Sequence, residues 1–448
     1  MCWKTAWRFG SFIVFLIFGA SLLAGLFCLL MFRSRLLNGY IKEHLEQAFA
    51  QSHQGYELRL GPMDYSVKGN RITAGTANLT GPALRIRCSQ VSVTGIPWLS
   101  LLWRKTPTPN MLGHADLVLT NIEAQFSSAG YRIRCARLEA SAHNSALIVL
   151  NGELAPLVGD ETFFAAHDFR TTRVRGVVPE FKVLGIDYEK LLQGKAYRAR
   201  SVLVSGPSFD VLVNCEKPPQ PLARSPMTPN DALTAIPLPV QLEHLVITNG
   251  GLTYGERATA EGKPGVLTFT DANLSIQGIA NRAELSTSMV VRATSRFMNA
   301  GALTLLLNMP VASTNLSLHY SGSLTAMDLG HLDNFLVPAE QMRIKSGSAQ
   351  GATFDIVVDS GRARGSVRGS YEDLKIAFLD KQTGSEKGLE NRLSSLVANA
   401  FKIRSSNHAD VLARPKEGRV EYVRGTQDGF VQYLWFALRT GVLDLISH

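Results

Sequence analysis

The chain has 448 residues, of which 45% are hydrophobic and 19% charged, and its formal net charge is +9 at pH 7. This length suits one large elongated domain or two to three compact ones. The charge is positive enough for nucleic-acid binding, but the basic residues form only short clusters and no nucleic-acid motif accompanies them, which excludes that class.

Three such clusters stand out in the printed sequence. Each spaces its arginines two to four residues apart and is predicted to be the solvated face of a strand; attraction to anionic lipid headgroups is the alternative. The clusters are Arg132/Arg134/Arg137, Arg170/Arg173/Arg175 and Arg362/Arg364/Arg368.

The most hydrophobic segment is the uncharged run Ser11–Phe32. A helix of that length spans a hydrocarbon core of about 30 Å. Lys4 and Arg8 precede it on a short tail, which predicts a single-pass anchor with a cytoplasmic N-terminus and the body on the far side. A cleaved signal peptide is the alternative, although its apolar core would be shorter, at roughly 7–15 residues.

From about Tyr56 the sequence changes to alternation with a period of two, as in Leu84–Cys88 and Ile122–Phe126. Alternation of this kind predicts antiparallel strands with one apolar and one wet face. Cys88 and Cys135 fall on the apolar positions of such strands. With Cys215 far from both, no disulfide framework is implied, and one bridge stays open for an oxidising compartment.

Helical periodicity is confined to a few segments. A helix is expected over residues 34–50, a short one over Ile186–Leu192, and two near the end over Leu389–Phe401 and Phe430–Ile446. Seven prolines lie between Glu216 and Pro239, which predicts an extended linker. The resulting layout is a cytoplasmic tail (1–10), an anchor (11–32), a first β region with an N-terminal helix (33–215), the linker (216–239) and a second β region closed by two helices (240–448).

No catalytic or metal-binding motif was found in the sequence, so neither an enzyme nor a cofactor is expected. Gly361–Gly369 has the glycine spacing of a phosphate loop. It lies among alternating residues with no helix after it, which favours a glycine-containing strand or hairpin instead.

Several segments resemble the AsmA-like proteins of Gram-negative envelopes, including a branch formerly classed as a domain of unknown function. The matching segments are YELRLGPMDYSVKGNRITAGTANLTG, VLGIDYEKLLQGKAYRARSVLVSGPSFDVLV, PLPVQLEHLVITNGGLTYGE and, most closely, the C-terminal GSVRGSYEDLKIAFLDKQTG, LENRLSSLVANAFKIRSSN and RVEYVRGTQDGFVQYLWFALRTGVLDLI. They are patterns of strands and helices and carry no catalytic signature.

The resemblance implies an inner-membrane anchor, Ser11–Phe32, and a periplasmic body of mainly β structure. In such a body an elongated, curled antiparallel sheet forms a hydrophobic groove that binds or conducts phospholipid without catalysis, for envelope lipid transport and homeostasis. The alternative is a structural or assembly factor for outer-membrane protein or envelope biogenesis, with other envelope proteins as partners. The groove candidates are Leu58, Ile86, Ile133, Phe209, Ile247, Phe269, Leu316 and Phe354.

Overall fold

The computed structural model of the chain describes residues 36–66, 70–96, 113–221, 226–259, 262–311, 315–380, 403–408 and 415–447. The expected anchor at 11–32, the tail before it and the expected helix at 389–401 lie outside these residues. No helix within the described ranges is long and apolar enough to span a membrane.

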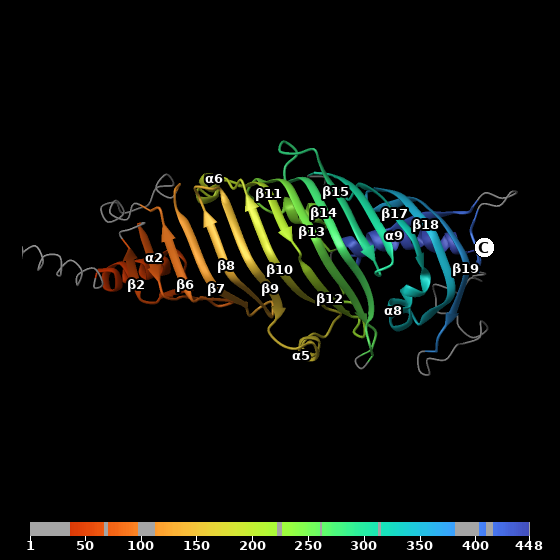
Figure 1. Cartoon of the computed structure of the whole chain (residues 1–448), viewed down its shortest axis with the longest axis horizontal. Helices are drawn as coiled ribbons and strands as arrows, with labels where there is room; N and C mark the ends of the chain where they lie inside the picture. Colours follow the sequence, from red (N-terminus) through yellow and green to blue (C-terminus); the bar gives the residue numbers. More distant parts are fainter. Residues whose placement is uncertain are drawn as a thin grey trace, which may run out of the picture. The chain divides into compact units, whose positions relative to one another are not determined.

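The protein is mainly β, with a large mixed sheet and a few helices (Figure 1). It divides into two compact units. The first contains the chain up to Ala129 together with Cys135–His143, and the second contains Gly130–Arg134 and the chain from Asn144 onward.

The first unit begins with a π-helical turn, η1 (Leu36–Ile41), and helix α2 (Lys42–Ser52), which confirms the helix expected there. Its strands form two series that both end on β7, all of them antiparallel. One series is β1, β4, β5 and the other is β2, β3, β6. The strands are β1 (Glu57–Leu60), β2 (Met63–Ser66), β3 (Arg71–Ala74), β4 (Ala77–Thr80), β5 (Leu84–Cys88), β6 (Gln90–Thr94) and β7 (Asp116–Phe126); β8 (Tyr131–Ser141) has residues in both units.

The second unit contains strands β9 to β20, the part of the sheet that is called the large sheet below. Its elements are β9 (Ala146–Pro156), α5 (Asp160–Ala165), β10 (Thr172–Leu184), α6 (Tyr188–Leu192), β11 (Tyr197–Ser205), β12 (Ser208–Asn214), α7 (Pro229–Thr234), β13 (Val240–Arg257), β14 (Gly265–Ala280), β15 (Ser288–Phe297), β16 (Gly301–Pro310), β17 (Leu318–Asp328), η2 (Leu329–Leu332), α8 (Asp333–Phe335), η3 (Leu336–Glu340), β18 (Met342–Asp359), β19 (Arg362–Phe378), β20 (Glu417–Val423) and α9 (Phe430–Ile446). The strands from β13 to β20 pair in chain order and are antiparallel.

The expectation of a purely antiparallel sheet is wrong where β11 and β12 pair with β13. Strands β11 and β12 lie end to end between β10 and β13, and both run parallel to β13. Parallel neighbours need a connection of about a dozen residues or more, and residues 215–239, including α7, supply one. The proline-rich segment therefore connects two neighbouring strands of one sheet.

Strand β13 continues through Asn249-Gly250-Gly251, residue types that commonly form turns. It is one strand of 18 residues. Asn249 has φ of 53°, and the register with β14 shifts on either side of Gly250. A bulge absorbs the left-handed residue and bends the strand without ending it. The predicted hairpin at Gly361–Gly369 is confirmed: Gly361 (φ 75°) is in the turn between β18 and β19, and Gly365 and Gly369 lie within β19.

Helix α9 confirms the last expected helix and packs on one face of the sheet, across its strands (Figure 1). Tyr433, Ala437 and Leu445 are buried in the main core together with side chains from β16 to β20. The helix backbone comes very close to β20, because a Cβ built on Gly418 would lie 1.9 Å from the Gly441 carbonyl oxygen. The glycines at these two positions are therefore what allows the helix to contact the strand.

Candidate functional site

One face of the large sheet is apolar from β9 to β20. Residues paired across neighbouring strands project from the same face of a sheet, so a chain of such pairs traces a row of side chains. The first row crosses eleven strands and contains no polar side chain except a tyrosine. In spatial order it is Leu147, Val183, Val202, Leu245, Ile276, Val291, Leu307, Tyr320, Ile356, Gly365 and Val420.

A second row lies beside the first on the same face, two residues further along each strand. It also crosses eleven strands and is apolar throughout. Its members are Val149, Phe181, Val204, Ile247, Leu274, Ala293, Leu305, Gly322, Phe354, Val367 and Gly418. We refer to the side of the sheet that carries these two rows as the apolar face.

The opposite, outer face differs in character from β14 onward. The row between the two described above, which projects from this face, is Ile148, Lys182, Leu203, Val246, Ser275, Arg292, Leu306, Ser321, Asp355, Ser366 and Arg419. Among its last seven members only Leu306 is apolar. The contrast shows that the two faces have different environments.

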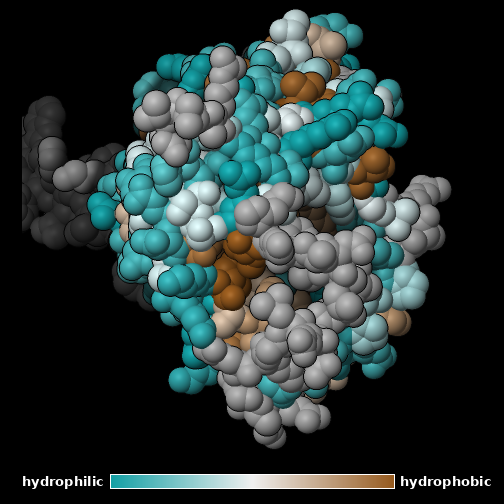
Figure 2. Space-filling model, turned by 90° about the vertical axis from the view of Figure 1, so that its right-hand side faces the viewer, coloured by the Kyte–Doolittle hydropathy of each residue, from teal (hydrophilic) through white to brown (hydrophobic). Residues whose placement is uncertain are grey.

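The apolar face is covered at one end and half-buried at the other. Near β17–β20 it lies beneath α9, where the Tyr320 hydroxyl donates a hydrogen bond to the Leu434 carbonyl oxygen at 3.0 Å. In the second row, Val367 and Gly418 are buried, whereas the side chains from Val149 to Leu305 are only half-buried. Figure 2 shows apolar side chains gathered in a recess that hydrophilic ones border.

The structure brings four of the eight groove candidates onto the apolar face of the large sheet. Ile247 and Phe354 belong to the second row. Phe209 and Phe269 are joined through Leu252, which pairs with both. Phe269 in turn pairs with Phe297, and their ring centroids are 5.2 Å apart.

The other four candidates lie elsewhere. Leu58 and Ile86 each pair with Leu79 and so share a face in the first unit. Ile133 is in β8 and exposed, and Leu316 precedes β17 and packs at the border of the main core. Sequence reasoning did not single out Leu252, Leu274 and Leu305, although the alternation in each of their strands carried the signal.

A second feature is a charged cavity of about 520 Å³ on the outer face, lined by residues of α5, of strands β10, β12, β13 and β14, and of the loop between β13 and β14. Its floor is Leu212, Gly255 and Val266, which pair across three strands. A Cβ on Gly255 would lie 3.0 Å from Leu212 Cδ1, so glycine keeps this floor open.

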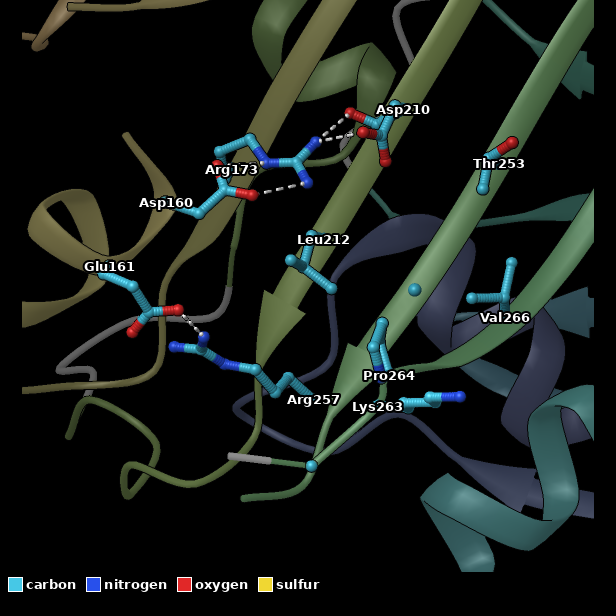
Figure 3. A pocket seen from close by; sticks show the side chains of 12 residues that line it. Asp160, Glu161, Arg173, Asp210, Leu212, Thr253, Arg257, Lys263, Pro264 and Val266 are labelled. Atoms are coloured by element: carbon cyan, nitrogen blue, oxygen red, sulfur yellow. Dashed lines mark hydrogen bonds and ion pairs between the residues drawn. The ribbon is translucent and has the colours of Figure 1, made fainter. Parts of the chain in front are cut away.

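Arginine side chains hold the charges of this cavity in pairs (Figure 3). The Arg173 guanidinium contacts the Asp210 carboxylate at 2.7 Å and the Asp160 carboxylate at 3.2 Å. Arg257 contacts Glu161 at 2.7 Å and lies over the Phe164 ring, 4.7 Å from its centroid. Each carboxylate that lines the cavity thus has a basic partner, as expected of a group that fixes α5 to the sheet.

The solvated-face prediction for Arg170/Arg173/Arg175 is wrong for Arg173. Its side chain is 4% exposed, because α5 folds over it and brings Asp160 into contact. Arg175, which bonds the same carboxylate at 2.6 Å, is 44% exposed. Nothing in the spacing of the three arginines marks the one that a helix covers.

Burial also raises the pKa of several side chains. It raises the pKa of Tyr433, under α9, to about 12, and burial together with a hydrogen bond to Asp428 raises the pKa of Tyr422 to about 12. Burial and the nearby Glu256 carboxylate raise the pKa of the Cys215 thiol to about 11. Cys88 and Cys135 are buried, as expected, and all three thiols are free.

Over the described part of the chain, no group of three or more His, Cys, Asp or Glu side chains is placed to hold a metal ion. No protein-family model and no curated protein matches the sequence. Two features of the structure therefore suggest a function, the apolar face and the charged cavity, and the apolar face is much the larger.

Proposed function

We propose that this chain is a non-catalytic, membrane-anchored protein that binds phospholipid, with the acyl chains lying on the apolar face of the large sheet. The observation that carries the proposal is the pair of apolar rows that continue past α9 as far as β9. Between β9 and β15 every member of these rows except Val202 is half-buried. Apolar surface left open to water is costly, and a bound acyl chain would remove that cost. The resemblance to AsmA-like proteins and the expected anchor support the same function, in the inner membrane with a periplasmic body.

The test compares two exposed leucines on opposite faces of the sheet. Leu252 is 37% exposed on the apolar face and Leu306 is 43% exposed on the outer face. A photoreactive benzoylphenylalanine is placed at one position or the other in the full chain, and membranes from producing cells are irradiated. Mass spectrometry of the purified protein then identifies adducts.

Phospholipid adducts are expected at position 252 and not at position 306. In the matching variants, Leu252→Glu is expected to lower the phospholipid that copurifies with the chain, and Leu306→Glu to leave it unchanged. Equal labelling at both positions, or none at position 252, would refute the proposal.

A second candidate function follows from α9. A helix of the chain itself already packs on the apolar face at β17–β20, which supports a function in which this face holds a helix of another protein. An envelope-assembly factor would use it to hold a segment of a client protein. Adducts to protein rather than phospholipid at position 252 would favour this second function.

A further inference from the structure

A small projection at the end of the large sheet exposes apolar side chains. We define it as the α6 knuckle, residues Asp187–Tyr197, which connects β10 to β11 at one end of these two strands (Figure 1). Leu191, Leu192 and Tyr197 are 37%, 51% and 47% exposed. Single exposed apolar residues are ordinary, but three within seven residues form a patch.

The knuckle is rigidly built, so its exposed leucines are not the product of a loose loop. The Asp187 carboxylate accepts the backbone N–H of Lys190 at 3.0 Å and caps the start of α6. At the other end Gly194, with φ of 64°, closes the helix, with the N–H of Gly194 bonded to the Leu191 carbonyl and the N–H of Lys195 bonded to that of Lys190. This is the hydrogen-bond pattern of a Schellman motif.

A side-chain clamp fixes the knuckle to the sheet. The Tyr188 hydroxyl donates a hydrogen bond to the Ala146 carbonyl at 2.8 Å, at the start of β9. The fixed backbone therefore leaves Leu191 and Leu192 exposed.

The charge around the patch is positive. Residues 187–200 contain four basic and two acidic side chains. Lys190 is paired with Asp187 at 3.1 Å, whereas the structure pairs Lys195 with no carboxylate within its described ranges. Two leucines and a tyrosine beside an unpaired lysine suit insertion into the interface of an anionic bilayer.

From this geometry we propose that the α6 knuckle is a membrane-docking surface, with an anionic phospholipid bilayer as its partner. Leu191 and Leu192 enter the interface, Tyr197 lies at headgroup depth, and Lys195 faces the phosphates. This contact is separate from acyl-chain binding on the apolar face. It gives the body a hold on a bilayer in addition to the expected anchor.

The test uses the full chain, with an environment-sensitive fluorescent amino acid at position 192, reconstituted into vesicles of phosphatidylglycerol and phosphatidylcholine. Spin-labelled phospholipid that quenches the fluorophore is placed in the vesicles that hold the chain or in added vesicles. Quenching from either set is expected, and it is expected to weaken in pure phosphatidylcholine and in high salt. The same fluorophore at Val357, which is 52% exposed on another strand, is the control and should not be quenched.

A second chain carries the fluorophore at position 197 together with Leu191→Ser and Leu192→Ser. Because both leucines are exposed, the variant should fold normally. Its quenching should be lower by roughly tenfold or more than that of a chain with the fluorophore at position 197 and both leucines intact. No quenching at position 192 from either set of vesicles, or equal quenching at position 357, would overturn the proposal. Copurified phospholipid should be unchanged in this variant, which separates a failure here from a failure of lipid binding on the apolar face.

Discussion

The Asp444 carboxylate of α9 accepts the backbone N–H of Arg419 at 2.7 Å, on the side of β20 that has no neighbouring strand among the described residues. One turn earlier in the helix, the Thr440 hydroxyl accepts the N–H of Glu421 at 3.4 Å. Free N–H groups on an edge strand are a template for pairing with another chain. Helix α9 therefore has two roles, since it covers the apolar face and also caps the edge of the sheet.

Removing this cap should promote self-association. We expect the double variant Asp444→Ala/Thr440→Val to form oligomers through β20 and to lose about 1–2 kcal/mol of stability. Light scattering after size exclusion measures the first effect, and urea unfolding of the same sample measures the second. Asp444→Asn keeps an acceptor oxygen and serves as the control, and equal oligomerisation of this control would contradict the role assigned to the cap.

Adding one carbon where α9 touches β20 should displace the helix. In Gly418→Ala the new Cβ meets the Gly441 backbone, which has no room to move, so we expect a loss of about 2–4 kcal/mol. Gly251→Ala adds the same carbon in β13, where the nearest atom is the Ser208 hydroxyl oxygen at 3.8 Å, and should cost under about 1 kcal/mol. Denaturant midpoints of the two variants give the comparison, which fails if they are alike.

The two arginines that share Asp160 should differ in their effect on stability. Arg173→Met leaves carboxylates of Asp160 and Asp210 without their buried partner, and we expect it to cost about 2–4 kcal/mol. Arg175→Met removes an exposed partner of the same carboxylate and should cost about 0–1 kcal/mol. Thermal unfolding followed by circular dichroism would measure both, and a larger loss in Arg175→Met would show that burial does not set the order.

Substitutions at Asn249 should change stability according to how well the new residue tolerates a left-handed backbone. Asn249→Gly tolerates φ of 53° and should leave stability within about 0.5 kcal/mol, whereas Asn249→Val should cost about 1–2 kcal/mol because a β-branched side chain resists that conformation. Urea unfolding of both variants measures the difference. Equal midpoints would contradict the prediction, because they would mean that β13 can lose its bulge without a loss of stability.

Alkaline pH should unfold the C-terminal core. Tyr422 and Tyr433 keep their protons to about pH 12 in the folded protein, whereas in an unfolded chain they lose them near pH 10. The unfolded state therefore holds fewer protons between these values, so stability is fully present below about pH 10 and falls as the pH rises toward 12. Tyrosinate absorbance and circular dichroism would be followed together, and Tyr433→Phe should move the onset of unfolding upward; an unchanged onset would contradict the prediction.

Sequence patterns predicted the local structure better than the partners of each strand. Alternation over Leu84–Cys88 predicts β5 directly, because a period of two depends only on which residues share a face. The parallel joint at β13 was missed because it depends on where the chain returns after residue 239. The Asn249 bulge was missed because Asn-Gly at a hairpin and at a bulge uses the same left-handed conformation.

For the candidate site too, the sequence predicted the character of single residues but not the partners that the fold gives them. Ile247 and Phe354 were recognised as facing apolar surroundings. Their common row depends on the pairing of six strands, β13 to β18, and the register between distant strands cannot be read from the local sequence. Arg173 was misjudged because α5 supplies Asp160, and the spacing of arginines in β10 contains no information about that helix.

The apolar rows take one residue from each strand, so their length is set by counting strands. At about 4.8 Å per strand, eleven strands make a row of roughly 48 Å. Inserting or deleting one antiparallel hairpin would change that length by about 10 Å and leave the pairing of all other strands as it is. The length of the apolar face can therefore change in fixed steps, by gain or loss of whole hairpins.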